Sequence, residues 1–250
     1  MSRSIEAIVD EQVRRWELLR HKPKGVKARP VLTVTGHHGA QGDELSRQLA
    51  TELGFDHFDR EIIHRVSESA HLSERVVASM DMKKRELLTD WLAAVASRNY
   101  LSPAEYRYHL ANVIGAIAHQ GGAVILGRGA NLLLRGEALR VLAVAPLEDR
   151  VRTVMEAEGL SERDARRRIV EVESDRHAFI LMHYHAEFAD PTAYDLVVNT
   201  AALGLDGSTA AIRAALATWR PRSDRQGAEA RETGQSRDAR RPVVPSSRSR

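Results

Sequence analysis

Three evenly spaced glycines could form a phosphate-binding loop. Gly36, Gly39 and Gly42 follow an apolar run at residues 31–35 and lead into a segment that begins with polar residues. A strand that passes through a glycine turn into a helix presents backbone N–H groups to an anion. A loop of the G-x-x-x-x-G-K-[ST] type would also contribute a lysine and a hydroxyl group. Here Gly42 stands at the lysine position and acidic residues follow it where the hydroxyl is expected, so the sequence predicts a phosphate loop without its cation.

We expect the whole segment 36–44 to be the candidate phosphate-contacting loop. Its residues are Gly36, His37, His38, Gly39, Ala40, Gln41, Gly42, Asp43 and Glu44. His37 and His38 could donate hydrogen bonds to phosphate or change charge near neutral pH, or they could be exposed turn residues without a chemical role. Glycine turns between a strand and a helix also arise for packing alone. The loop by itself therefore leaves both interpretations open.

No metal site follows from the sequence. Cysteine is absent, which excludes disulfides, thiolate metal sites and cysteine nucleophiles. His177, His183 and His185 are six and two positions apart, whereas neighbours on one face of a helix are three or four apart. Asp43 and Glu44 fall in the first turn of the helix after the loop, where the helix dipole stabilises a carboxylate. That structural role accounts for both without a metal ion.

A series of strands and helices must position the loop. Apolar and β-branched runs predict strands at 31–35, 55–58, 123–126, 140–145 and 196–199. Helical patterns lie at about 43–53, 60–69, 82–98, 103–119, 147–157, 162–185 and 206–219. Strands that alternate with helices predict the α/β class, with a parallel five-stranded sheet and helices on both of its faces.

Polar clusters follow three of the predicted strands. They lie at 36–44, 59–61 and 127–129. The ligands of open parallel sheets bind beyond the carboxyl ends of the strands. We therefore expect the three clusters to line one crevice at that edge of the sheet.

Charge divides the 250-residue chain into three parts, although its net charge is only +3. Residues 1–30 hold eight Lys/Arg and four Asp/Glu, residues 31–219 hold 20 and 26, and residues 220–250 hold nine and four. The acidic middle part argues against a dedicated nucleic-acid-binding domain. The basic tail at 220–250 could bind nucleic acid or an anionic membrane by counterion release. It has almost no apolar residue apart from Val243 and Val244, which predicts instead a disordered, solubilising segment.

The first 30 residues form a separate segment. Apolar residues recur at helical spacing over 5–20, which predicts an amphipathic helix before a linker that ends at residue 30. Its apolar face needs a partner, which could be the domain at 31–219, a second copy of the chain or another protein subunit, or a membrane face. No apolar run approaches the roughly 18 residues of a spanning helix, and no secretory signal pattern occurs. The sequence thus predicts a cytoplasmic protein.

Six segments in order resemble the cytidylate kinase-like family, which are P-loop relatives of the nucleoside monophosphate kinases. They are TVTGHHGAQGDELSRQLATELG, FDHFDREII, VILGRGANLLL, LRVLAVAPLEDRV, GLSERDARRRI and YDLVVNT, within residues 31–216. The resemblance implies a P-loop NTPase-type fold with a helical lid at about 160–187. Members of this family often end the loop without G-K-[ST], so the missing lysine is similar to the family's own pattern.

The resemblance also assigns roles by position. It implies that the loop 36–44 holds the phosphates of ATP as donor, together with Mg²⁺. Asp59, Arg60 and Glu61 match an element that faces the acceptor monophosphate or its metal ion. Arg128, after Gly127, matches an arginine suited to bidentate phosphate contact. The implied catalytic residues are Asp59 and Arg128, together with the lid arginine discussed next.

Arg176 in the segment ESDRHAF matches the lid arginine of the family. The neighbouring pattern departs from the family, because Glu173 and Ser174 stand where an Asp–Lys pair is usual. True cytidylate kinases also carry an aspartate after the arginine of the third strand, where this chain has Gly129. Cytosine specificity therefore does not follow from the resemblance.

Four further arginines crowd the start of the predicted lid. They are Arg163, Arg166, Arg167 and Arg168. A lid of this kind could supply the transition-state charge that a loop lysine normally gives. A helix with alternating Arg and Glu is also the pattern of a solvated face. Both interpretations stay open at this point.

Three functions compete on this evidence. The first is ATP-dependent phosphoryl transfer to a nucleoside monophosphate or similar small acceptor. The second is a catalytically weak nucleotide-binding regulator that acts through its terminal segments. The third is a nucleic-acid-associated protein that acts through its tail. One cation on the transferring group can change the rate by 10³–10⁵, or about 4–7 kcal/mol, so the fate of the missing lysine charge separates the first two.

Overall fold

The computed structural model describes residues 29–78 and 105–222, together with a few single residues. These are Asp10, Arg14, Glu86, Leu88, Thr89 and Leu92. The predicted amphipathic helix at 5–20, the helical segment at 82–98 and the basic tail beyond residue 222 therefore lie outside the described residues, apart from these single positions. The predictions for them stay predictions.

Five parallel strands form one sheet in the order β2-β3-β1-β4-β5. They are β1 (Val31–Gly36), β2 (Asp56–Phe58), β3 (Ala123–Leu126), β4 (Leu139–Val144) and β5 (Leu196–Asn199). Every residue of β1 and β3 is buried, as expected for central strands of a sheet that is covered on both faces. The five predicted strands and the parallel α/β class are confirmed.

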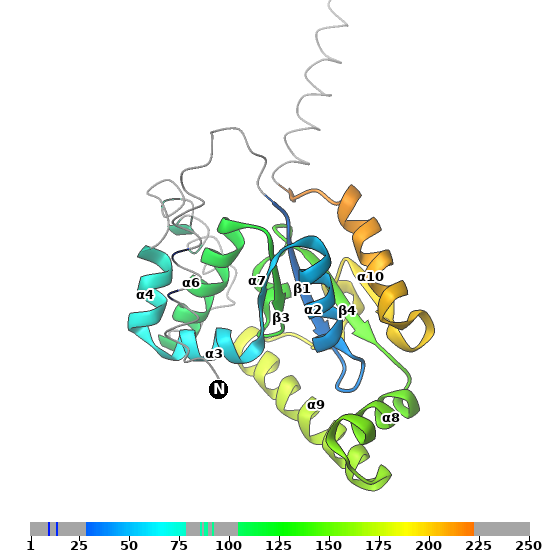
Figure 1. Cartoon of the computed structure of the whole chain (residues 1–250). Helices are drawn as coiled ribbons and strands as arrows, with labels where there is room; N and C mark the ends of the chain where they lie inside the picture. Colours follow the sequence, from blue (N-terminus) through cyan, green and yellow to red (C-terminus); the bar gives the residue numbers. More distant parts are fainter. Residues whose placement is uncertain are drawn as a thin grey trace, which may run out of the picture.

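Helices cover both faces of this sheet (Figure 1). The described helices are α2 (Gly42–Leu53), α3 (Arg60–Glu68), α4 (Ala70–Ala78), α6 (Glu105–Gln120), α7 (Ala130–Leu133), α8 (Leu147–Glu158), α9 (Glu162–Tyr184) and α10 (Thr200–Thr218), with a 3₁₀ turn, η1 (Pro191–Ala193). In Figure 1, α8 and α9 extend past the edge where β1 gives way to α2. The predicted lid is thus an arm at the carboxyl ends of the strands.

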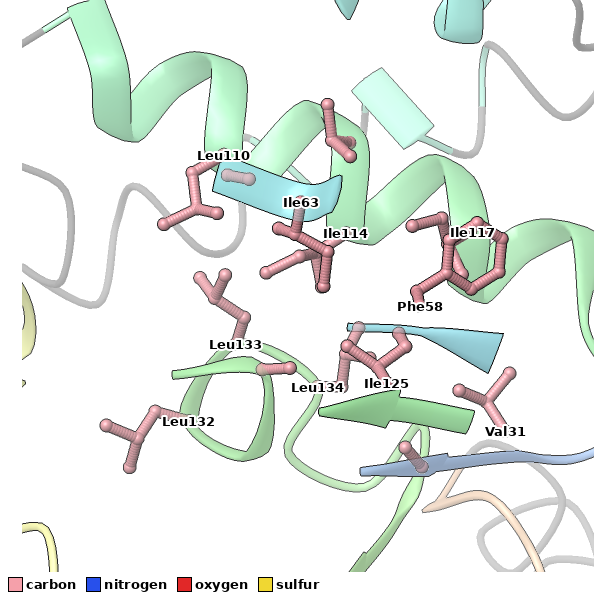
Figure 2. Packing of buried hydrophobic residues seen from close by; sticks show 14 of the residues in the cluster. Val31, Phe58, Ile63, Leu110, Ile114, Ile117, Ile125, Leu132, Leu133 and Leu134 are labelled. Atoms are coloured by element: carbon pink, nitrogen blue, oxygen red, sulfur yellow. The ribbon is translucent and has the colours of Figure 1, made fainter. Parts of the chain in front are cut away.

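Two apolar clusters hold the layers together, one on each face of the sheet. The face under α3, α4, α6 and α7 buries Val31 and Ile125 from the central strands; Figure 2 shows Ile125 facing Ile63 of α3 and Ile114 of α6. The face under α2 and α10 buries alternate strand residues such as Leu32. Strand side chains alternate between faces with a period of two, so each central strand contributes to both clusters.

Helix ends follow local rules, with one correction. Gly54 closes α2 in a left-handed conformation, and the Ser161 hydroxyl caps α9 at the Asp164 N–H. The last helix, predicted from residue 206, begins at Thr200 because the Asn199 side chain caps it. Gly204, with a φ of 66°, interrupts its first turns, which hid the helical pattern there. Within the described residues, no helix is long and apolar enough to cross a membrane.

Candidate active site

The loop 36–44 joins the end of β1 to the start of α2. A Cβ atom added to Gly36 would lie 3.5 Å from the Gly42 Cα, so the two glycines let the strand end and the helix start come into contact. Gln41, the N-cap residue of α2, has a φ of 53° and makes no capping hydrogen bond with its side chain. The Gln41 side chain therefore does not compete with another acceptor for the backbone N–H groups at the start of α2. That is the arrangement an anion site at a helix N-terminus requires.

Neighbouring elements fix the loop at several points. The His37 N–H donates to the Ala143 carbonyl of β4 at 3.0 Å, and the Thr200 hydroxyl donates to the Ala40 carbonyl at 3.1 Å. Gly39 has a φ of 83°, and a Cβ there would lie 2.6 Å from the Arg150 carbonyl oxygen of α8. Only glycine fits at this position, because both the backbone conformation and the space exclude a side chain.

Three arginines converge beside the loop. Arg60 Nη2 donates to both carboxylate oxygens of Asp43, at 2.8 and 2.7 Å. Arg128 Nε donates to the Arg60 carbonyl at 3.1 Å. Arg176 Nη1 donates to the Gly36 carbonyl at 2.6 Å. Each of the three arginines, predicted at a different strand end or on the lid, therefore contacts the loop 36–44 or another arginine of the group.

Burial makes the Arg176 charge costly in the absence of an anion. Burial first, and then the charge of Arg60, lower the pKa of Arg176 to about 10, against the opposing effect of Asp43 and Glu173. Arg176 is still cationic at neutral pH. A buried arginine with a second arginine charge close to it favours binding of an anion near both.

All three arginines line a cavity of about 580 Å³. Among its lining residues are all those predicted for the acceptor side, which are Asp59, Arg60, Glu61 and Arg128, together with Gly127 and Arg176. A smaller cavity of about 190 Å³ is lined by the loop, including His37, Gly39, Gln41 and Glu44, and by α8. Of the predicted loop residues, Ala40 lines neither cavity; it is fully buried and accepts the Thr200 hydrogen bond.

The two cavities meet at a shared wall. Gly36, Asp43, Arg60 and Arg176 line both of them. A ligand group bound on the loop and a second one bound beside Arg128 would thus face each other across Arg60 and Arg176. The arrangement can hold two anionic ligands with positive charge at their junction.

The acidic residues at the start of α3 are held in place locally. Asp59 caps this helix, because its Oδ1 accepts from the Ile62 N–H at 2.8 Å. Glu61 pairs with Arg65 one turn later, and that hydrogen bond lowers the pKa of the Glu61 carboxyl. Asp59 combines a structural contact with a place on the cavity wall.

The histidines of the loop are neutral at pH 7. Burial lowers the pKa of His37 and of His38, although Glu173 opposes the shift at His37 and Glu158 opposes it at His38. Nearby arginines, Arg176 among them, act in the same direction as burial. A neutral imidazole can donate one hydrogen bond without adding a charge.

The sequence pattern that defines the cytidylate kinase-like family matches residues 31–202. The chain belongs to the cytidylate kinase-like family. This confirms the resemblance, and the matched residues include the loop, the three arginines and the whole of α9. The pattern covers all five strands of the sheet.

Curated cytidylate kinases match most of this cytidylate kinase-like chain. The cytidylate kinase of Thermococcus kodakarensis is 28% identical over 202 residues, covering 81% of this chain and 94% of the relative. That of Pyrococcus horikoshii is 25% identical over 83% of this chain and 99% of the relative. Among solved structures, an uncharacterized protein from Eubacterium ventriosum superposes with a TM-score of 0.54 at 14% identity, covering 76% of this chain and 100% of that one. This last likeness concerns the fold alone.

Ion pairs account for most of the arginines at the start of α9. Arg166 pairs with Glu148 and Glu162, and Arg167 pairs with Asp164 and Glu171. Neither lines the two cavities, so they match the solvated-face interpretation. Arg168 is different, since it lines the larger cavity while pairing with Glu158.

Sequence reasoning missed two residues that hold the loop of this cytidylate kinase-like chain. Glu173 Oε1 accepts from Arg150 Nη1 at 2.6 Å and from the His38 N–H at 3.3 Å. The Glu173 carboxylate is thus an anion bound by Arg150 and by a backbone N–H of the loop 36–44. The departure from the family pattern at Glu173 was a usable signal, whereas nothing in the sequence marked Arg150, which lies on a different helix.

Proposed function

We propose that this protein transfers the γ-phosphoryl group of ATP to a nucleoside monophosphate or a similar small acceptor. The observation that carries the proposal is the convergence of Arg60, Arg128 and Arg176 on the cavity that adjoins the phosphate loop. A regulator that only bound ATP would have no need for a second arginine-rich cavity in contact with the first.

In the proposed reaction, ATP binds with its phosphates on the loop 36–44 and the acceptor binds in the larger cavity. A phosphate oxygen of the acceptor attacks the γ-phosphorus, and the bond from that phosphorus to the β-bridging oxygen breaks, which leaves ADP. Arg60 and Arg176 line both cavities, so their charges lie where the transferred group passes. Such reactions need positioning and charge stabilisation, and no nucleophilic side chain.

Arg176 is our candidate for the charge that the loop lacks. It is largely buried, contacts the loop through the Gly36 carbonyl and stands between the cavities. A desolvated cation acts on a developing phosphoryl charge more strongly than an exposed one. Arg128 lines only the larger of these two cavities, which suits it to the acceptor phosphate.

Magnesium fits the oxygen donors of the site. Glu44 lines the smaller cavity and Asp59 the larger one, and carboxylates together with nucleotide phosphates are the ligands that Mg²⁺ prefers. When bound with ATP, the ion would neutralise phosphate charge.

We further propose that residues 31–219 are the catalytic domain, with the lid at about 160–187. CMP is the first acceptor to test, because the relatives that match most of the chain are cytidylate kinases. The segments 1–30 and 220–250 would then be appendages that the reaction does not require.

A panel of monophosphates tests the proposal. Purified protein with Mg²⁺ and ATP is given CMP, UMP, dCMP, AMP or GMP, and the diphosphate products are separated and quantified. We expect turnover with at least one of them. The single variants Arg128→Ala and Arg176→Ala should each lower that turnover at least tenfold. Arg213→Ala is the matched control, since Arg213 pairs with Glu52 on the surface and lines neither cavity.

The opposite result is equally clear. If ATP binds but no monophosphate in the panel is phosphorylated, the proposal that this protein transfers a phosphoryl group to nucleotides is wrong. The missing loop lysine would then favour the nucleotide-binding regulator.

A further inference from the structure

The turn after β3 has an unusual backbone. Gly127, Arg128 and Gly129 have φ values of 72°, 54° and 70°, so three successive residues are left-handed. Glycine adopts this conformation freely, but a residue with a side chain does so rarely. The left-handed Arg128 therefore needs surroundings that hold it.

Tyr184 supplies the closest of these surroundings. Its hydroxyl donates to the Arg128 carbonyl at 2.7 Å, and its side chain is only 2% exposed. A Cβ added to Gly129 would lie 2.2 Å from Tyr184 Cε2. The ring thus rests directly on the turn, and Gly129 is the residue that makes room for it.

The side chain of Arg128 is held as well. Its guanidinium lies 5.3 Å above the centre of the Phe179 ring, within the range of a cation–π contact. Its Nε donates to the Arg60 carbonyl at 3.1 Å. The backbone and the side chain of Arg128 are each fixed by an aromatic residue of α9.

The same helix reaches the phosphate loop. Arg176, three residues before Phe179, donates to the Gly36 carbonyl at 2.6 Å. One continuous helix therefore connects the loop to the turn that carries Arg128. Movement of this helix relative to the sheet would shift both arginines together.

We infer that Tyr184 is a positioning residue for Arg128, and that α9 acts as a shared frame which sets Arg128 and Arg176 relative to each other. The inference rests on the proposed function in one respect, which is that Arg128 binds the phosphate of the acceptor. Tyr184 itself lines neither of the two cavities that we assign to the substrates, so its effect passes through the turn. Gly129 stands where true cytidylate kinases carry an aspartate. In this view a glycine is required there because the Tyr184 ring occupies the space that a side chain would need.

Tyr184→Phe tests this inference in the full-length protein. In protein carrying ¹⁵N-labelled arginine, the Nε–H signal of Arg128 is assigned by its loss in Arg128→Lys. We expect Tyr184→Phe to shift or broaden this signal, because the carbonyl contact that holds the turn is gone. We also expect the KM for the acceptor to rise at least fivefold, with the KM for ATP unchanged within twofold.

Two further variants keep the test decisive. Phe179→Leu removes the ring under the guanidinium and should move the same signal if Tyr184→Phe does not fold. Asn112→Ala is the control, since it also removes a buried side-chain hydrogen bond to a backbone carbonyl, that of Tyr108 on α6, and should leave the Arg128 signal in place.

Failure of the inference differs from failure of the proposed function. An Arg128 signal that is unchanged in folded Tyr184→Phe, or in Phe179→Leu where Tyr184→Phe does not fold, overturns the inference, whatever the activity. Absence of turnover in the wild-type protein overturns the proposed function instead, and the comparison of spectra still decides whether Tyr184 positions Arg128.

Discussion

Asp43 and Arg60 tie together two helices that start at separate strands of the sheet. The carboxylate of Asp43, in the first turn of α2, accepts both hydrogen bonds from a single nitrogen of Arg60, the first residue of α3. β1 and β2, which precede these helices, are separated by β3 in the sheet. The pair therefore sets the orientation of an arginine that both cavities share.

Removal of the Asp43 carboxylate should affect function more than stability. The side chains of Asp43 and Arg60 are 38% and 33% exposed, and ion pairs of that exposure contribute only about 0–1 kcal/mol. We expect Asp43→Ala to lower the free energy of unfolding in urea by less than about 1 kcal/mol. The KM for the acceptor should rise several-fold, because Arg60 loses its fixed orientation. Glu52→Ala, which breaks the surface pair with Arg213, is the control; equal KM values in both variants would contradict the prediction.

Glu173 should be coupled to Arg150 in stability. Arg150 is the more buried partner, and Glu173 also accepts from the His38 N–H. Glu173→Ala leaves a buried guanidinium without its carboxylate, so we expect a loss of about 1–3 kcal/mol in the free energy of unfolding. Arg150→Ala with Glu173→Ala should cost less than the sum of the two single changes. Urea unfolding of the four proteins measures this, and strictly additive losses would show that the pair is not coupled.

The elements of this fold were predictable where local rules decide them. β1 is a fully buried apolar run, and α9 begins with a serine that caps it. The crevice followed from topology, because β2 and β3 are neighbours in a parallel sheet, so Arg60 and Arg128 leave the same edge. That rule placed two of the three arginines together before any contact was known.

Contacts between distant helices were not predictable. Arg150 meets Glu173, and Tyr184 meets Arg128 across 56 positions, by tertiary placement that no local pattern encodes. The four-residue helix α7 is too short for a helical period to show. The lid arginines stayed ambiguous because the same alternation of Arg and Glu suits a solvated face and a phosphate-binding lid.

The buried histidines predict how stability depends on pH. Burial lowers the pKa of His37, His38 and His57 below the ordinary value of 6.5. The unfolded chain therefore binds more protons than the folded one as pH falls below 6.5, and the folded state loses stability through that window. Above pH 6.5 this contribution is fully present.

We expect the free energy of unfolding to rise from pH 5 to 6.5. Above pH 6.5 the contribution of these histidines should be constant. Each histidine adds at most about 1.4 kcal/mol per pH unit to the slope. Urea unfolding at several pH values measures it, and His57→Gln should flatten the rise. His71→Gln, on the exposed face of α4, is the control. A slope that His57→Gln and His71→Gln change equally would argue against the burial of His57 as its cause.

Gly39 and Gly159 form a matched pair of glycines, and replacing each by alanine tests how the shape of the loop 36–44 is maintained. Both are left-handed, with φ values of 83° and 65°, but a Cβ at Gly39 would lie 2.6 Å from the Arg150 carbonyl oxygen, whereas nothing lies within 4 Å at Gly159. Gly159→Ala should cost about 1 kcal/mol in the free energy of unfolding, from the backbone conformation alone. Gly39→Ala should cost about 1–3 kcal/mol more, because the methyl group displaces α8 from the loop.

The same pair separates loop shape from general stability. Because the phosphates of ATP would contact the loop, Gly39→Ala should also weaken ATP binding at least tenfold, while Gly159→Ala, at the far end of α8, should leave it unchanged. Isothermal titration at a temperature where both variants are folded gives the two affinities. Equal affinities would mean that the contact between Gly39 and Arg150 does not shape the nucleotide site, and that the loop owes its form to the Thr200 and Ala143 contacts instead.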